Sequence, residues 1–162
     1  MSKIYYTIIY ILFHSIIFCE CDGFNWHHEI DSNDCNENDI SVLKQFIYNS
    51  GASLNIDMDY NYDGVISATE LGWQLWENGR LIHLICSEVP SPYYFYEFDC
   101  GLSGPIPNDI FKLDAIMKLH LYNNSLSDDI PESICDLPNV NFGRYWFNLD
   151  YNNLCPPYPD CL

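Results

Sequence analysis

The sequence predicts an α/β fold in which a short helical module precedes a small solenoid of repeated strand-and-turn units. Residues 102–113 and 126–137 align at a fixed offset of 24 residues, and a period of that size is typical of solenoids. Before the repeats, residues 39–47 carry apolar side chains at helical spacing. The expected division is a leader over residues 1–21, a helical module over 22–79, and repeats with a C-terminal cap over 80–162.

The first 21 residues read as a secretory signal peptide. A short basic start precedes an apolar run over residues 4–18, which is too short to span a bilayer comfortably. Cys19 and Cys21 are small residues at positions −3 and −1 of a cleavage site before Asp22. An uncleaved N-terminal anchor is the alternative. The sequence therefore predicts a secreted, extracellular protein.

The formal net charge is −17, and loss of Lys3 and Glu20 with the leader leaves it unchanged. So acidic a surface repels phosphate and anionic lipid at long range. The charge argues against nucleic acid as a partner and against membrane binding beyond the signal peptide. Cations are the favoured counterpart.

An acidic segment over residues 59–70 places an oxygen ligand at every position that a twelve-residue calcium loop requires. Gly64 falls at position 6, where such a loop turns sharply. The segment resembles an EF-hand, which implies Ca²⁺ as the bound ion; the alternative is an Asp- and Asn-rich surface turn. The expected ligands at positions 1, 3, 5, 7, 9 and 12 are Asp59, Asn61, Asp63, the Val65 carbonyl, Ser67 and a bidentate Glu70.

The same resemblance implies a helix on each side of the loop. The entering helix is expected over residues 39–47, with Asp39 as N-cap and Gly51 as its stop, and the leaving helix over residues 68–77. EF-hands normally pair, and the sequence holds no second loop. We therefore expect a weak site, with a Kd of roughly 10⁻⁴ to 10⁻³ M, in which calcium is structural rather than sensory.

The repeats contain the pattern LxLxxNxL, in residues 119–126. With the flanking repeat residues, this pattern resembles the plant-type leucine-rich repeat of receptor-kinase ectodomains and polygalacturonase-inhibiting proteins. The resemblance covers roughly residues 80–162. It implies that the leucines point into the core and that the Asn124 side-chain amide satisfies backbone groups of the turn. Residues 76–84 resemble the strand that precedes such repeats, and residues 153–161 resemble their cysteine-paired cap.

Cleavage after residue 21 would leave six cysteines, and an even number in an exported chain favours disulfides over metal thiolates. Cys155 and Cys161 are expected to pair, because only five proline-rich residues separate them and the resembling caps contain such a pair. Three pairings remain open for Cys35, Cys86, Cys100 and Cys135. Asn123-Asn124-Ser125 is a glycosylation sequon, and whether it is modified is open.

The concave face of the repeats is the second candidate site. Side chains between and after the strand leucines should project outward there, although each alone also fits an ordinary exposed strand residue. Because the chain has neither a nucleophile motif nor a phosphate loop, we expect a non-enzyme that recognises an extracellular protein, peptide or polysaccharide. The alternatives are a secreted calcium buffer or matrix protein, and an inhibitor of a secreted hydrolase. The expected binding surface is Lys118, His120, Tyr122, Asn123, Asn148, Asp150 and Tyr151.

Overall fold

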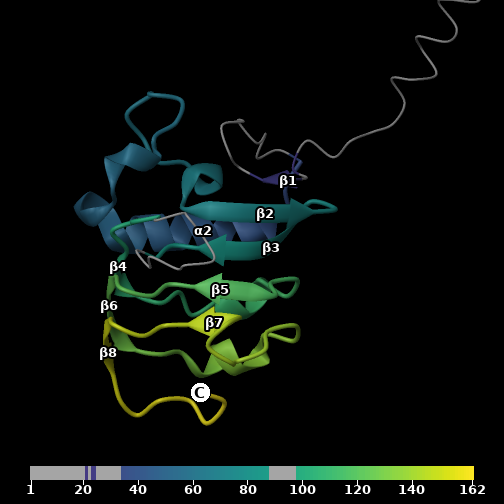
Figure 1. Cartoon of the computed structure of the whole chain (residues 1–162), viewed down its shortest axis with the longest axis vertical. Helices are drawn as coiled ribbons and strands as arrows, with labels where there is room; N and C mark the ends of the chain where they lie inside the picture. The colour runs from purple at the N-terminus through teal and green to yellow at the C-terminus, as the bar shows by residue number, and fades with distance from the viewer. Residues whose placement is uncertain (1–20, 22, 25–33, 88–97) are drawn as a thin grey trace, which may run out of the picture.

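The computed structural model describes residues 21, 23–24, 34–87 and 98–162 of the chain. Within these residues the fold is mixed α/β, with one α-helix, two β-sheets and short 3-10 helices (Figure 1). The helix is α2 (Glu37–Ser50), and the 3-10 helices are η1 (Gly51–Ser53), η2 (Ile56–Met58), η3 (Ala68–Glu70), η4 (Ile110–Lys112) and η5 (Glu132–Asp136). The strands are β1 (Gly23–Phe24), β2 (Trp73–Glu77), β3 (Arg80–Ile85), β4 (Ser103–Pro105), β5 (Lys118–His120), β6 (Ser125–Asp129), β7 (Phe147–Asn148) and β8 (Asn153–Cys155).

Helix α2 confirms the helix predicted over residues 39–47 and extends it at both ends. Its N-cap is Asn36, not Asp39, because the Asn36 side chain accepts hydrogen bonds from the backbone N–H groups of Asn38 and Asp39. Asp39 lies inside the first turn and is buried. Gly51 ends the helix as expected, with a φ of 53° that favours glycine.

The leaving helix expected over residues 68–77 is wrong. Only η3 is helical there, and the following residues form strand β2, which pairs antiparallel with β3. The reason is the two-residue connection Asn78-Gly79, whose φ angles of 51° and 72° build the turn that best joins two twisted strands. The expected boundary between residues 79 and 80 falls at the end of this turn.

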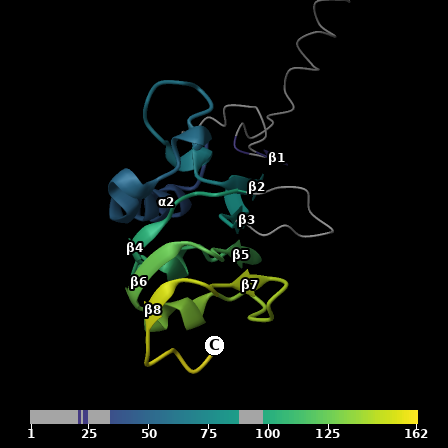
Figure 2. The ribbon, with the colours of Figure 1, turned by 60° about the vertical axis from the view of Figure 1, so that its left-hand side comes forward.

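Strands β3, β5 and β7 run parallel and carry the core of the second half of the chain. Leu84, Leu119 and Phe147 lie in register across them, and all three side chains are buried. A second parallel sheet, in the order β4-β6-β8, lines the neighbouring side of the molecule (Figure 2). On the sheet side opposite the solvent, η4 lies beside η5.

The 24-residue offset places equivalent residues in equivalent surroundings. Strands β4 and β6 pair in parallel with Gly104 opposite Leu126, so the strand register is two residues short of the repeat offset. Eight apolar residues of the two aligned segments are buried, four from each: Leu102, Ile106, Ile110, Leu113, Leu126, Ile130, Ile134 and Leu137. The repeated pattern therefore marks core positions, as the sequence predicted.

Asn124 satisfies backbone groups of adjacent segments, as expected. Its Oδ1 accepts from the Leu102 N–H at 2.9 Å, and its Nδ2 donates to the carbonyls of Cys86, Leu121 and Tyr122. Asn152 makes the corresponding bonds 28 residues further on, including one from the Leu126 N–H at 3.0 Å. These two amides join successive turns through hydrogen bonds that water would otherwise have to supply.

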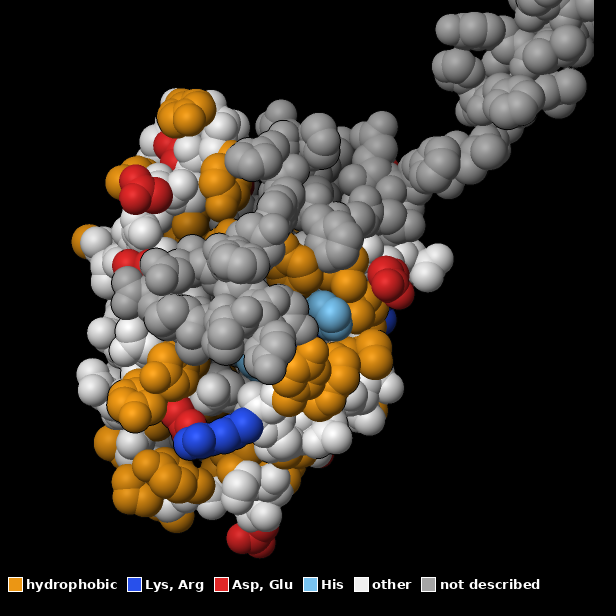
Figure 3. Space-filling view, viewed as in Figure 1, with side chains coloured by type: hydrophobic (Ala, Val, Ile, Leu, Met, Phe, Trp, Pro, Cys, Tyr) orange, Lys and Arg blue, Asp and Glu red, His pale blue; other side chains and the backbone are white. Residues whose placement is uncertain are grey.

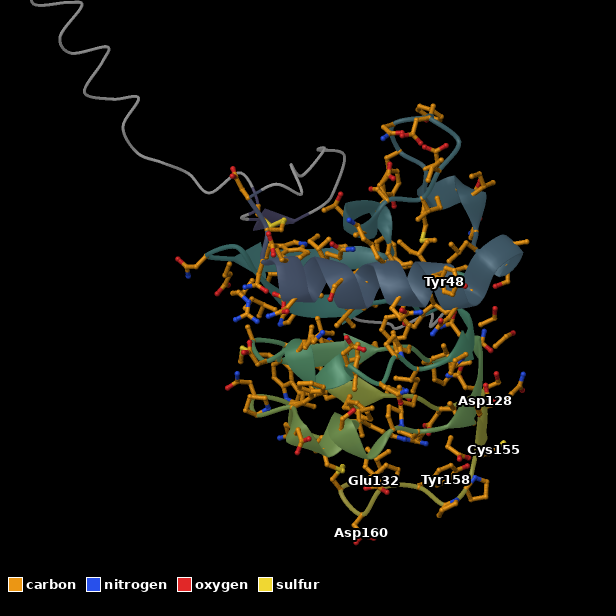
Figure 4. All side chains as sticks on the ribbon, turned by 180° about the vertical axis from the view of Figure 1, so that it is seen from behind. Tyr48, Asp128, Glu132, Cys155, Tyr158 and Asp160 are labelled. Atoms are coloured by element: carbon orange, nitrogen blue, oxygen red, sulfur yellow. A yellow bond between two sulfur atoms is a disulfide. The ribbon has the colours of Figure 1, made fainter. Side chains whose placement is uncertain are left out.

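Helix α2 and the residues after it pack directly against the first parallel strands. Asn49 donates to the Pro105 carbonyl at 2.7 Å, and Ser53 donates to the Gly101 carbonyl at 2.6 Å. Buried apolar residues from α2, β2, β3 and the repeats form one core. Seen from behind, α2 lies across the end of the stacked strands (Figure 4).

Disulfide bonds correct two expectations. Cys21 is buried and bonded to Cys35, so cleavage at the expected position after residue 21 would remove half of this disulfide. The leader itself lies in residues outside the described part. Among the described cysteines the other pairs are Cys86–Cys100 and Cys135–Cys161, which leaves Cys155 exposed as a free thiol.

The predicted Cys155–Cys161 pair is therefore wrong. Cys155 belongs to β8 and lies at the surface near Tyr158 (Figure 4), whereas Cys161 returns to η5, where Cys135 lies. Short separation in sequence did not bring the two sulfurs together, because Cys155 is fixed in β8 whereas Cys161 lies in a turn after Pro159 and bonds to Cys135. None of the helices in the described residues has the length and apolar composition of a membrane span.

Candidate functional site

The Glu70 side chain, at the last position of the predicted calcium loop, closes the loop through hydrogen bonds to backbone N–H groups nearer its start. Glu70 Oε1 accepts from the Asn61 N–H at 3.3 Å and Oε2 from the Ser67 N–H at 2.8 Å. Asp59 accepts from the N–H groups of Asp63 and Gly64 at 3.1 and 2.8 Å. The loop therefore brings positions 1, 3, 5, 9 and 12 of the expected ligand set into one hydrogen-bonded unit.

The two end carboxylates are buried, while the middle of the loop is exposed. Asp59 and Glu70 retain 8% and 7% of their accessible surface. Among the described residues, no Lys, Arg or His forms an ion pair with either of them. Burial without an opposite charge is costly, so a cation would be favoured there. The donor chemistry of carboxylate, amide, hydroxyl and carbonyl oxygens fits calcium.

The carboxylates do not yet converge on a single point. In the part of the chain that the structure describes, no three His, Cys, Asp or Glu side chains are arranged to hold a metal ion. The Asp59 and Glu70 oxygens are aimed instead at backbone N–H groups of the loop. Asn61 and Asp63, two further residues of the expected ligand set, have exposed side chains.

Gln74 ties the end of this loop to the sheet. Its Nε2 donates to the carbonyls of Ala68 and Leu71, and its Oε1 accepts from the indole N–H of Trp76, all at 2.8 Å. Gln74 and Trp76 are both fully buried. Since every polar group of this cluster is satisfied, it fixes the loop exit relative to β2.

The second candidate site is the outer sheet face, which we define as the solvent side of β3, β5 and β7 with the residues beside it. Trp73 stacks on His83 with ring centroids 6.0 Å apart, and the His83 ring lies 6.5 Å from Trp146. In Figure 3, histidine side chains lie among hydrophobic ones on the side that carries these strands. The face is therefore an aromatic surface on a rigid sheet.

Lys118 lies at the centre of this face. Its Nζ is 4.6 Å from the Tyr145 ring centroid and 6.0 Å from that of Trp146, distances at which a cation is attracted to the ring. Burial lowers the pKa of Lys118, although the nearby Tyr145 acts in the opposite direction. Lys118 on β5 lies opposite His83 on β3. His83 therefore lies next to Lys118, the first of the seven predicted binding residues.

The two histidines of the face are held neutral. Burial, followed by the charge of Lys118, lowers the pKa of His83 below its usual value. Burial and then Lys118 lower the pKa of His120 to about 4, although its hydrogen bond to the Tyr145 carbonyl acts in the opposite direction. The 2.9 Å bond to that carbonyl requires the proton on Nε2.

Acid should therefore destabilise the fold through these histidines. Each takes up a proton in the unfolded chain near pH 6.5 but resists it in the fold, so their stabilisation is complete above pH 6.5 and is lost as the pH falls toward 4. We expect His120→Gln to remove about 2 kcal/mol of the stability difference between pH 7.5 and 4.5, allowing for partial exposure. Urea unfolding of both proteins at the two pH values measures this. Parallel pH profiles would contradict it.

The seven predicted binding residues fall into two groups. Lys118 and His120 belong to the outer sheet face, with Asn148 opposite His120 in the register of β5 and β7. The other four lie at the turns where the strands end; Tyr122 and Tyr151 are in ring contact there at 5.0 Å, and the Asn123 N–H donates to the Asp150 carbonyl at 3.0 Å. The structure thus gathers all seven along one side but not at one point.

Sequence reasoning missed Trp73, His83, Tyr145 and Trp146. Trp73 was predicted to lie in a helix, so its position on β2, where its ring stacks on His83, was not foreseen. The sequence does carry a signal for this arrangement, since Asn78-Gly79 between two apolar runs is a strong hairpin signal. Tyr145 and Trp146 lie in the longer third repeat, for which the 24-residue pattern gives no position.

Comparisons with known proteins bear on the fold. The sequence matches no protein-family model, and no curated protein matches it. The structure is similar to a plant leucine-rich-repeat receptor ectodomain in the crystal structure of PEPR1-AtPEP1, with a TM-score of 0.52 and 14% sequence identity. The similarity covers 74% of this chain but 15% of that one, in which PEPR1 is bound to the peptide AtPEP1. At this identity the likeness concerns the fold alone.

Proposed function

We propose that this protein is a secreted, non-enzymatic leucine-rich-repeat recognition module whose outer sheet face binds an extracellular peptide or protein. The observation that carries the proposal is the row of Trp73, His83 and Trp146 with Lys118 beside it. Tryptophan and tyrosine are among the residues that dominate binding energy at protein interfaces. A solenoid supplies the rigidity, because its strands are fixed by their neighbours and lose little entropy on binding.

Two further observations support an extracellular recognition role. The described residues contain three disulfides, which persist in oxidising compartments. The structural neighbour binds a peptide, and its fold is similar over 74% of this chain. Its length is several times that of this chain, so its own partner is not carried over.

The test is to select ligands that bind the full chain and then to measure their affinity for two variants, one altered in the outer sheet face and one altered on β6. A displayed peptide library and a glycan array are screened against the disulfide-bonded protein. Binders are expected from the peptide library, and Trp146→Ala should weaken them by more than about tenfold, the usual loss at an aromatic anchor. Asp129→Ala on β6 serves as the control and should leave affinity unchanged.

The outcomes separate the alternatives. Binders that are insensitive to Trp146→Ala while the variant keeps its melting temperature would overturn the assignment of the face. Binding of polysaccharides alone would replace the peptide with a glycan as the partner. If neither library yields a ligand, the recognition role fails and the chain is better explained as a calcium-binding scaffold.

We also propose that Ca²⁺ binds at residues 59–70 and stabilises the helical end of the molecule. The buried Asp59 and Glu70 carboxylates, which have no cationic partner in the described residues, support this. Asp59, Asn61, Asp63, the Val65 carbonyl, Ser67 and Glu70 would hold the ion, which would supply charge neutralisation and no reaction. Its role would be to fix the exit of the loop, where Gln74 and Trp76 join it to β2.

Calcium is expected to raise the melting temperature. At ten times the Kd, binding adds about 1.4 kcal/mol, which corresponds to ~3–6 °C for a chain of this length. Asp59→Asn should abolish the rise. Asp57→Asn is the matched control, since it makes the same charge change at an exposed residue just before the loop, and it should keep the full rise. Calcium dependence that survives Asp59→Asn would place the ion elsewhere.

A further inference from the structure

We infer that Asn123 is a glycan acceptor, which rests on the proposed extracellular function. Asn123-Asn124-Ser125 is the single Asn-X-Ser/Thr triplet among the 162 residues. Such triplets are modified when they reach the lumen of the export pathway and lie on a surface loop. The structure adds that both outer residues of the triplet are exposed while the middle one is directed inward.

The three residues divide their tasks. The Asn124 side chain points into the molecule. Its amide forms hydrogen bonds with four backbone groups, those of Leu102, Cys86, Leu121 and Tyr122. Asn123 and Ser125, on either side of it, have exposed side chains. The internal amide ladder therefore leaves the acceptor and the hydroxyl residue on the solvent side, and a glycan would displace none of its bonds.

The repeat itself does not require asparagine at position 123. The residue has a φ of 54°, which asparagine tolerates better than most side chains. Yet the equivalent position before the next ladder asparagine, Asn152, is Tyr151, whose φ is 58°. Since the same turn forms there around tyrosine, backbone geometry alone does not account for the full triplet.

The modification is a substitution at the side-chain amide. Nδ2 of Asn123 loses a proton and bonds to C1 of an oligosaccharide carried on a lipid diphosphate. The bond between C1 and the diphosphate oxygen breaks, and the diphosphate leaves with its electron pair. The reaction neither oxidises nor reduces the chain, so the three disulfides of the described residues are unaffected.

A glycan at Asn123 would shield one end of the predicted binding surface and leave the other accessible. Asn123 lies five residues beyond Lys118, in the turn that follows the end of β5 at His120. Tyr122 and Tyr151 are at the glycan end, whereas His83 and Trp146 are at the Lys118 end. The inference therefore narrows the proposed partner site to the aromatic row.

The experiment uses the full chain in a eukaryotic secretory host in two versions, one with its own N-terminus and one with a strong heterologous leader. Intact mass is measured before and after peptide-N-glycosidase, which leaves aspartate at a formerly modified asparagine. We expect a removable mass increase mapped to residue 123. Asn123→Gln and Ser125→Ala should each abolish it, Ser125→Thr should keep it, and Ser127→Ala, an equivalent serine outside the triplet, should not change it.

The version with the heterologous leader tests the inference by itself. If that protein is secreted and folded but Asn123 carries no glycan, the inference is wrong, whether or not the version with its own N-terminus is secreted. Failure of the native version to leave the cell, with a glycan on the directed version, would instead refute the proposed extracellular function. Ser125→Ala separates folding from modification, since the Ser125 backbone N–H still donates to the Leu102 carbonyl at 2.8 Å. Its melting temperature should therefore stay close to that of the deglycosylated parent.

Discussion

Gly72→Ala is expected to be strongly destabilising, with a loss above about 4 kcal/mol. Gly72 has a φ of 65°, and a Cβ atom there would lie 2.6 Å from both the Ile85 carbonyl oxygen and the Cys86 sulfur, and 2.8 Å from the Cys100 sulfur. A carbonyl in a paired strand and a buried disulfide cannot move aside as a flexible side chain can. The substitution should therefore separate the loop exit from the first parallel strand.

The control is Gly51→Ala, which has a comparable φ of 53° but nothing within 4 Å of the added atom. It should cost only the backbone strain, about 1–3 kcal/mol. Urea unfolding monitored by tryptophan fluorescence compares the two variants under conditions that keep the disulfides intact. Equal losses would mean that the close approach at Gly72 relaxes without penalty.

Asp39→Ala is expected to cost about 3–5 kcal/mol, because it removes the buried carboxylate of the Asp39–Arg80 pair and leaves the Leu81 N–H without its acceptor. Asp39 is fully buried and accepts from Arg80 Nε at 2.9 Å, from Arg80 Nη2 at 3.0 Å and from the Leu81 N–H at 2.9 Å. These bonds connect the first turn of α2 to the first residues of β3. Arg80 also contacts Asp114, which extends the link into the repeats.

Asp109→Ala is the comparison, since the Asp109–Lys112 pair is largely exposed and such pairs contribute about 0–1 kcal/mol. Chemical denaturation measures both losses. The double variant Asp39→Leu with Arg80→Met should recover most of the stability, because replacing a buried pair by apolar groups is often close to neutral. A loss in Asp39→Ala no larger than in Asp109→Ala would show that the buried pair is not a principal link.

The parts of the fold that the sequence predicted are those encoded by periodic side chains. Leu102 and Leu126 mark the same core position 24 residues apart, and Asn124 marks the turn by a side chain that only this geometry satisfies. Helix α2 was predicted for the same reason, since its apolar side chains recur at a fixed spacing. Periodicity reports which face is buried, and burial largely decides the local structure.

The predictions that were wrong depend on contacts between distant segments. Residues 68–77 have apolar side chains that fit a helical period, but pairing of β2 with β3 decides the outcome. The pairing of Cys161 with Cys135 spans 26 residues and depends on how the C-terminal segment crosses η5. Contacts between segments that are distant in sequence, such as these two, are not signalled by any local sequence pattern.

The candidate sites divide in the same way. The expected loop ligands were chosen from spacing within twelve consecutive residues; in the structure the Glu70 carboxylate accepts from the backbone N–H groups of Asn61 and Ser67, and the ligand role stays a prediction. The outer sheet face combines Trp73 and Trp146, which are far apart in sequence and both lie beside His83. Lys118 and His120 were predicted because they lie within a recognisable repeat, whereas their aromatic neighbours do not.

The antiparallel strand β2 limits how this architecture can change in length. Because β2 occupies the side of β3 where another parallel strand would pair, new units can be added only on the side of β5 and β7. Insertion or loss of a repeat would thus leave the residue 59–70 loop, α2 and the Asp39–Arg80 pair in place. Repeats can therefore be added in one direction only, and duplication would extend the outer sheet face without disturbing β3, its first strand.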